Sequence, residues 1–238
     1  MNPLWILAVI VGLAGMALFA WSIKALDGPG ALAAFAMGLL IVWRTDVGWL
    51  VLLVSFTAVS VIATKIGQRT KEARKAAESR GGERGIRNVL ANGLAAVIVI
   101  LFLPWAGIDA VALGFATAVA AVTADTMASE IGALSTRTRR IVAPFEPLRP
   151  GQNGGVSWLG QGASLIGAAL IAVLAVLLIG IPWSLAWIPA LAGFLGCQLD
   201  SILGATLERD EHHDRPLTKE DVNFIASLVP AMLVLLVA

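Results

Sequence analysis

Long apolar stretches separated by short polar segments run through the chain, and they predict a bundle of membrane-spanning helices. A spanning helix needs about 20 mainly apolar residues, and fewer where the bilayer is locally thin. The candidate spans are 4–23, 29–43, 46–64, 88–105, 108–132, 158–180, 183–207 and 222–238. The second is short and Pro189 interrupts the seventh, so six or seven full spans are an alternative to eight. The predicted fold is an all-α polytopic transmembrane helix bundle in a single domain, 1–238.

The composition excludes a soluble domain. Hydrophobic residues make up 58% of the chain, charged residues 14%, and the mean hydropathy is +0.84. Soluble domains carry roughly 25% charged residues, so this chain could not cover a water-facing globule of its size. The single cysteine excludes an intramolecular disulfide and a thiolate metal cluster. The net charge of +1 does not point to nucleic acid.

Basic residues set the expected orientation, because the cytoplasmic loops of membrane proteins are enriched in Lys and Arg. With eight spans, all of the 17 basic residues except Arg44 fall on one side, mostly in loops 65–87, 133–157 and 208–221. We therefore expect an integral membrane protein whose active site faces the cytoplasm and whose two termini lie outside. Small residues in the apolar stretches are compatible with a homodimer but do not define one.

Polar residues inside the apolar stretches are the main functional signal. Asp125 and Asp200 come near the ends of helices that run toward the cytoplasm, and Asn92 and Asn223 come near the starts of helices that leave it. All four are therefore predicted to lie at a similar shallow depth beneath one membrane face. A charge at bilayer depth costs at least ~2.5–3.5 kcal/mol, so such a group usually has a partner or a function.

The acidic residues suggest a cation site. Glu130 lies close to Asp125 in sequence, Ser129 is one helical turn after Asp125, and Ser201 follows Asp200. Carboxylate, amide and hydroxyl oxygens favour Mg²⁺ or Ca²⁺ over zinc. A divalent-metal site is the leading interpretation, and an ion relay or plain hydrogen bonding between helices are the alternatives.

A glycine-rich segment, 149–157, precedes the sixth candidate span and suggests an anion site. Its backbone N–H groups and the following helix N-terminus can face an anion, although a flexible turn is the alternative. The segment includes Gly151, Asn153, Gly154 and Gly155. Lys65, Arg84 and Arg87 are candidates for binding anionic oxygens, but for the two arginines the positive-inside rule is an equally good explanation.

Six ordered motifs, which cover nearly the whole chain, resemble a known membrane family. They are Thr-Lys-Ile-Gly at 64–67, Arg-Asn-Val-Leu-Ala-Asn-Gly at 87–93, Ala-Asp-Thr-Met-Ala-Ser-Glu-Ile-Gly at 124–132, Pro-Gly-Gln-Asn-Gly-Gly-Val-Ser at 150–157, Leu-Asp-Ser-Ile-Leu-Gly-Ala-Thr at 199–206 and Asp-Val-Asn-Phe-Ile-Ala-Ser at 221–227. The family contains the plant chloroplast phytyl-phosphate kinase of vitamin E synthesis. Asp125, Ala128 and Ser129 also match an Asp-x-x-Ala-Ser element of the remotely similar polyprenol kinases and CDP-diacylglycerol synthases. The chain departs from the family at Gln152 and at 139–142.

The resemblance implies transfer of a phosphoryl group from a nucleoside triphosphate, with CTP favoured, to a prenyl monophosphate such as phytyl or geranylgeranyl phosphate. Asp125 and Asp200 would then hold Mg²⁺, with Glu130 assisting and Arg87 beside them in the catalytic group. The residues expected to contact the nucleotide or its phosphates are Lys65, Arg84, Asn92, Ser129, Gly151, Asn153, Gly154, Gly155, Ser201 and Asn223. The expected partners are the prenyl lipid, the nucleotide and membrane lipids.

Other functional classes remain open at this point. A nucleotidyltransferase that forms a CDP-lipid would use similar groups but would release pyrophosphate. A transporter or ion pathway also uses membrane acids and broken helices, but it needs polar groups through the midplane, and here they gather near one face. A scaffold would not need a glycine-rich anion loop.

Overall fold

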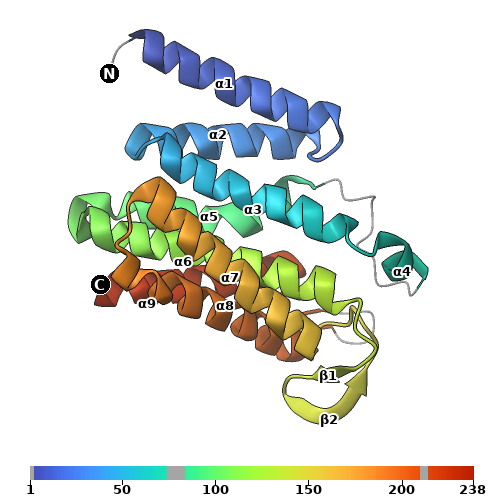
Figure 1. Ribbon diagram of the computed structural model, residues 1–238. Helices are drawn as coiled ribbons and strands as arrows, with labels where there is room; N and C mark the ends of the chain where they lie inside the picture. The colour runs from blue at the N-terminus through green and yellow to red at the C-terminus, as the bar shows by residue number, and fades with distance from the viewer. Residues whose placement is uncertain (1–2, 74–83, 210–213) are drawn as a thin grey trace.

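Apolar helices run back and forth along one axis in the computed structural model, which describes residues 3–73, 84–209 and 214–238 (Figure 1). The long helices are α1 (Pro3–Ser22), α2 (Gly28–Arg44), α3 (Val47–Lys65), α5 (Ile86–Leu101), α6 (Leu103–Gly132), α7 (Trp158–Ile179), α8 (Trp187–Thr206) and α9 (Lys219–Val237). Two short ones, α4 (Gln68–Ala73) and the 3₁₀-helix η2 (Trp183–Leu185), lie between them. The loop residues Arg74, Lys75 and Arg80, which entered the charge argument, lie outside the described residues.

The predicted fold class is confirmed: the protein is a polytopic helical membrane protein. Within the described residues, six helices are long and apolar enough to cross a membrane. The other two apolar helices, α2 with 17 residues and α5 with 16, are shorter. Both termini lie at one end of the bundle, and α4 and the strands lie at the other end (Figure 1).

Two helix boundaries can be compared with the sequence prediction. Pro189 does not interrupt its helix, because α8 begins at Trp187 and places the proline in the first turn, where no intrahelical N–H bond is lost. The break expected between residues 105 and 108 is present, because Gly107, with a φ of 76°, interrupts α6 and separates its first residues from the long helix that follows. A further change of direction comes earlier, where α5 ends at Leu101 and α6 begins at Leu103.

A small antiparallel sheet, absent from the all-helical prediction, forms in the 133–157 loop. Its strands are β1 (Thr138–Arg140), β2 (Ala143–Leu148) and β3 (Gly155–Val156), in the order β2-β1-β3. The glycine-rich segment is the connection between β2 and β3 and contributes β3 itself. It is therefore an ordered turn held beside the end of the bundle (Figure 1).

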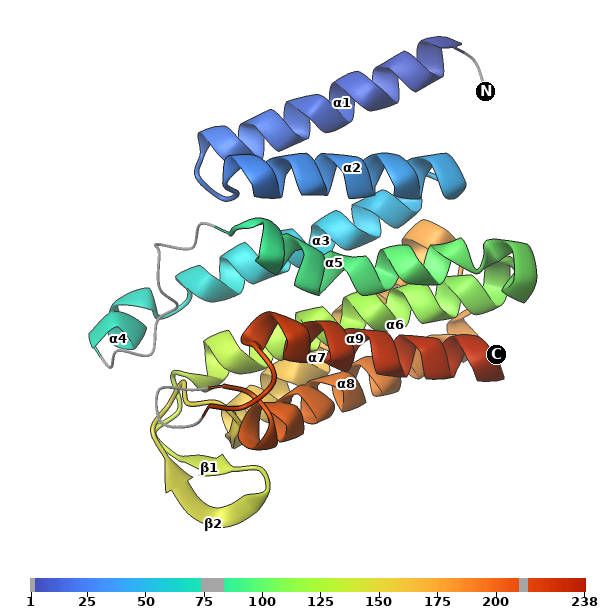
Figure 2. The ribbon, with the colours of Figure 1, turned by 180° about the vertical axis from the view of Figure 1, so that it is seen from behind.

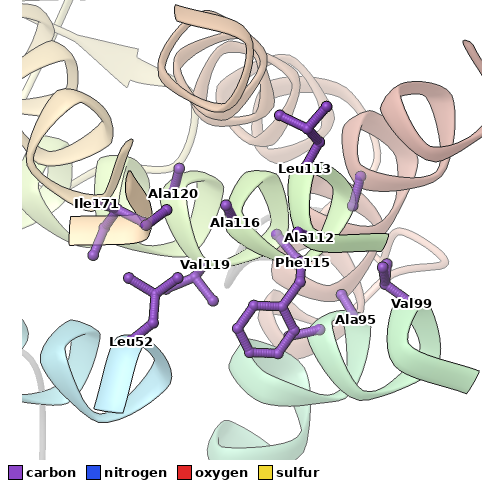
Figure 3. Packing of buried hydrophobic residues seen from close by; sticks show 14 of the residues in the cluster. Leu52, Ala95, Val99, Ala112, Leu113, Phe115, Ala116, Val119, Ala120 and Ile171 are labelled. Carbon is purple, nitrogen blue, oxygen red and sulfur yellow. The ribbon is translucent and has the colours of Figure 1, made fainter. Parts of the chain in front are cut away.

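The core is built around α6, whose buried side chains are mostly alanine and valine (Figure 3). Helices α3, α5, α7, α8 and α9 all pack against it. Figure 2 shows α5 and α9 lying on α6 on the face opposite α7. Because alanine side chains are small, neighbouring helices come close to α6, as is typical of helix packing in membranes.

Candidate active site

Helices α6 and α8 approach closely just before their acidic residues. A Cβ atom added to Gly193 would lie 2.5 Å from Ala120 Cβ, and one added to Gly196 would lie 2.8 Å from Ala121 Cβ. Asp125 and Asp200 follow Ala121 and Gly196 by four residues each, which is about one helical turn. The close contact therefore brings the two carboxyl groups side by side, near enough for a direct interaction.

Asparagines from α5 and α9 complete this acidic cluster. Asn92, Asp125, Asp200 and Asn223 line one small cavity between the helices. When its amide is oriented to suit its neighbours, Asn223 donates hydrogen bonds to Asp200 Oδ2 (3.2 Å) and to the Lys219 carbonyl (3.1 Å). The sequence predicts that these four polar residues lie at one membrane depth. In the structure they lie next to one another.

The glycine turn lies against the end of α8. Gly154 has a φ of +70°, and a Cβ atom there would lie 2.6 Å from Ala205 Cα, so only glycine fits both the backbone and the space. The Gln152 and Gly155 amides donate within the turn, to the Arg149 carbonyl (3.2 Å) and the Gln152 carbonyl (3.0 Å). Among the described residues, the backbone amides of Gly151, Asn153 and Gly154 donate no hydrogen bond, which leaves them available to an anion.

The glycine turn and the aspartates line the same larger cavity, of about 140 Å³, which we call the carboxylate cavity. Helices α6, α7, α8 and α9 each contribute to its wall. Its polar lining from the sequence prediction consists of Asp125, Ser129, Glu130, Gly151, Asn153, Gly154, Gly155, Asp200, Ser201 and Asn223. The segment that looks like a flexible loop in the sequence is therefore one wall of the cavity that holds the acidic residues.

Two charged residues of this cavity, Glu208 and Lys219, were not predicted. Glu208 is only 7% exposed, and its Oε1 accepts a hydrogen bond from Asn153 Nδ2 at 2.7 Å. Lys219 begins α9, where Thr218 and Asp221 form a capping box. The helical spacing held a signal for Lys219, because it precedes Asn223 by four residues and shares its face.

Glu130, which is predicted to assist the cation site, contacts side chains of α3 and α4. Its Oε2 forms an ion pair with Lys71 of α4, a side chain that is 1% exposed, and its Oε1 accepts a hydrogen bond from Thr64 Oγ1 at 2.9 Å. Lys71 also donates to the carbonyl oxygens of Ala63 (3.2 Å) and Thr64 (2.7 Å). Both carboxylate oxygens of Glu130 thus have a partner, so this side chain joins α3 and α4 to the wall of the carboxylate cavity.

The three predicted phosphate-binding basic residues are placed differently from one another. Lys65 is exposed at the end of α3 and does not line the carboxylate cavity. Arg87 is also exposed and lines a surface groove with Asp221 and Phe224. Arg84 is half-buried and lines a third, narrower cavity together with Asp125 and Lys219. Among these three, Arg84 alone is near the aspartates.

The helix ends give the site a divided electrostatic character. The N-terminal turns of α7 and α9 contribute Ser157, Gly160, Lys219 and Asn223 to the carboxylate cavity, and helix N-termini favour anions. The aspartate carboxylates line the same cavity and attract cations. The cavity therefore suits an anion and a cation bound together.

The donor set fits a magnesium ion that arrives with a phosphate ligand. Within the described parts of the chain, no group of three or more His, Cys, Asp or Glu residues could hold a metal by itself. The carboxylates of Asp125 and Asp200 lie next to each other, and amide and hydroxyl oxygens line the same cavity. Mg²⁺ is usually bound by one or two carboxylates plus substrate phosphates and water, and the site meets that requirement.

The stability of the protein should depend on pH because of Glu208. Burial raises the pKa of Glu208 to about 7, against an opposing effect of Lys219 and with a further increase from Asp125. The folded protein therefore keeps a proton that the unfolded chain loses between the ordinary glutamate pKa and about 7, and stability falls as the pH rises through that window. Thermal melting in detergent should show this fall in the native protein and a smaller one in Glu208→Gln. Parallel pH profiles for the two proteins would contradict it.

These features define a polytopic membrane protein with a polar, acidic site at one end of its helix bundle. The chain belongs to the family described as "Integral membrane protein DUF92", whose model matches residues 11–231. This match confirms the family inferred from the six ordered motifs.

Relatives are found in archaea and plants. The chain is 32% identical to an uncharacterized membrane protein of Methanocaldococcus jannaschii, over 90% of this chain and 86% of that protein. It is 31% identical to Protein PGR of Arabidopsis thaliana, over 78% of this chain and 73% of the relative. It is 30% identical to Protein VTE6, chloroplastic, of the same plant, over 85% of this chain and 62% of the relative. No solved structure is significantly similar to the chain.

Proposed function

We propose that the protein is a membrane prenyl-phosphate kinase that moves the γ-phosphoryl group of a nucleoside triphosphate, CTP by preference, to a prenyl monophosphate. The bond from the γ-phosphorus to the β–γ bridging oxygen breaks, and a new bond forms to an oxygen of the lipid phosphate. The products are a prenyl diphosphate and a nucleoside diphosphate. The attacking oxygen is already anionic, so this reaction needs no strong general base.

The observation that carries the proposal is the meeting of Asp125 and Asp200 with the glycine turn in one cavity. Phosphoryl transfer depends mainly on positioning and on neutralising charge, and this cavity offers both kinds of group. The resemblance of the ordered motifs to the family of a plant phytyl-phosphate kinase supports the prenyl acceptor. Asp125, Ala128 and Ser129, which match an element of CTP-using lipid enzymes, all line the cavity and support CTP as donor.

Each group of the cavity has a role in this scheme. Asp125 and Asp200 would hold Mg²⁺, which supplies charge neutralisation on the donor phosphates. The backbone amides of Gly151, Asn153 and Gly154 bind the triphosphate, and Lys219 adds a positive charge. Asn223 holds the Asp200 carboxylate in place. The basic loops favour a cytoplasmic site with both termini outside, where the nucleotide is available.

The test uses purified protein in detergent with Mg²⁺, CTP or ATP, and a panel of prenyl monophosphates. We expect a prenyl diphosphate together with the nucleoside diphosphate, and faster turnover with CTP than with ATP. Release of pyrophosphate with a CDP-lipid would instead identify a nucleotidyltransferase. Absence of any lipid product across the panel, with protein that is folded and binds nucleotide, would contradict the kinase.

A further inference from the structure

A separate cavity, of about 120 Å³, lies between α2, α3 and α5, outside the carboxylate cavity. Most of its lining is apolar, and we call it the apolar cavity. Its apolar wall includes Ala34, Met37, Gly38, Leu50, Leu53 and Phe56. None of these residues has a role in the chemistry described above, so the cavity needs its own explanation.

One end of the apolar cavity is polar and borders the aspartates. Arg84, Asn88 and Asn92 line both the apolar cavity and the narrow cavity that contains Asp125 and Lys219. Asn92 also reaches the cluster of Asp125, Asp200 and Asn223. The polar residues therefore stand between an apolar space on one side and the acidic site on the other.

The structure fixes this polar end in place. The Arg84 guanidinium donates to the Oγ of Ser60, which is fully buried, and the Asn92 amide donates to the Asn88 carbonyl at 2.8 Å. The Arg84 backbone pairs with the α1–α2 turn, donating to the Ala25 carbonyl (3.0 Å) and accepting from the Asp27 amide (3.1 Å). Asp27 in turn caps α2. Hydrogen bonds therefore hold Arg84 beside the start of α2.

Two glycines in the lining let neighbouring side chains pack closely around the apolar cavity. A Cβ atom on Gly93 would lie 2.2 Å from Met37 Cε, and one on Gly38 would lie 2.9 Å from Leu13 Cδ2. Along α5 the lining runs from Asn88 to Gly93, which is roughly 7–8 Å at 1.5 Å per residue. The shape is that of a slot with a cationic, amide-rich mouth and a hydrocarbon interior.

We infer that the prenyl chain of the acceptor occupies the apolar cavity, with its phosphate at Arg84, Asn88 and Asn92. This inference rests on the proposed function for the identity of the lipid. An arginine and two amides suit a phosphate monoester, and a hydrocarbon chain is the ligand that an apolar slot stabilises. The arrangement puts the acceptor phosphate on one side of Asp125 and the glycine turn on the other. Side chains on α2, and Ala34 first among them, would then set the accepted chain length.

The first arm of the test is photolabelling, which does not depend on turnover. Geranylgeranyl phosphate with a diazirine at the far end of its chain is irradiated with the purified protein, and the adducts are mapped by mass spectrometry. We expect labels on α2 and α3, at positions such as Met37 and Leu53. Labels confined to lipid-facing positions of other helices would overturn the inference. Displacement by phosphatidic acid at equal concentration would assign the slot to a two-chain lipid and would also overturn it.

The second arm uses a matched pair of substitutions on α2. Ala34 lines the cavity, whereas Ala36 on the same helix is exposed and does not. Ala34→Phe should lower labelling, and should lower kcat/KM for geranylgeranyl phosphate about tenfold more than for dimethylallyl phosphate. Ala36→Phe should behave like the native protein. Equal decreases in kcat/KM for both substrates in Ala34→Phe would overturn the inference. If the native protein is labelled on α2 but forms no prenyl diphosphate, the kinase activity is disproved, whereas the binding of the lipid in the apolar cavity still holds.

Discussion

Replacing Asp125 or Asp200 with asparagine should lower phosphoryl transfer by roughly 10³-fold or more, because each change removes a ligand of the Mg²⁺ that is expected to stabilise the transition state by several kcal/mol. Both side chains line the same cavities, beside the glycine turn and Lys219. The substitution keeps the size of the side chain, and asparagine at position 200 can still accept the hydrogen bond from Asn223. Folding should therefore be retained, and turnover should be measured as γ-phosphate label appearing in the lipid.

The matched control for these variants is Asp109→Asn. Asp109 is an exposed acid near the start of α6, on the same helix as Asp125 but at the other end of the bundle. Turnover and melting temperature of Asp109→Asn should match those of the native protein. Substantial turnover in both Asp125→Asn and Asp200→Asn would remove the cation assignment.

Breaking the buried ion pair between Lys71 and Glu130 should have the largest effect on stability. Lys71→Met leaves the Glu130 carboxylate buried without its cation, a change that typically costs about 3–5 kcal/mol. Glu130 is 7% exposed and Lys71 is 1% exposed, so water cannot replace the lost partner. The free energy of unfolding in detergent, or the melting temperature, should fall accordingly. Turnover should fall too, since Glu130 lies in the wall of the carboxylate cavity.

Two further variants distinguish the effect of losing the ion pair from the effect of losing one positive charge. Lys65→Met removes an exposed lysine at the end of α3 and should leave stability nearly unchanged. The double variant Lys71→Met/Glu130→Gln has no uncompensated buried charge and should recover much of the stability that Lys71→Met loses. If Lys71→Met melts like Lys65→Met, the ion pair does not stabilise the fold.

Much of the helical fold is predictable from the sequence, because hydrophobic length and loop charge report directly on membrane spans. The differences between the predicted and observed elements have local causes that hydropathy does not report. Pro189 falls in a first turn, and whether a proline breaks a helix depends on where that helix begins. The sheet is missed because β1 and β3 have only three and two residues, too few for an alternating pattern.

The site is predictable where alternating helix direction fixes depth, as it does for Asp125, Asp200, Asn92 and Asn223. It is not predictable where a charge belongs to a loop in sequence and to the interior in space. Lys71 looks like one of many positive-inside residues, yet α4 folds back so that it meets Glu130, 59 positions away. Glu208 follows the end of α8 and accepts a hydrogen bond from Asn153 in the glycine turn, 55 positions away. Such pairings need the tertiary structure.

In the proposed mechanism, Asp125 and Asp200 together hold the divalent cation of a bound nucleotide. Electron paramagnetic resonance of Mn²⁺, a spectroscopic substitute for Mg²⁺, measures this directly in the presence of a non-hydrolysable CTP analogue. We expect tight Mn²⁺ binding only when the native protein and the analogue are both present, and clearly weaker binding in Asp125→Asn and in Asp200→Asn. Equal Mn²⁺ affinity in the native protein and in both variants would contradict it.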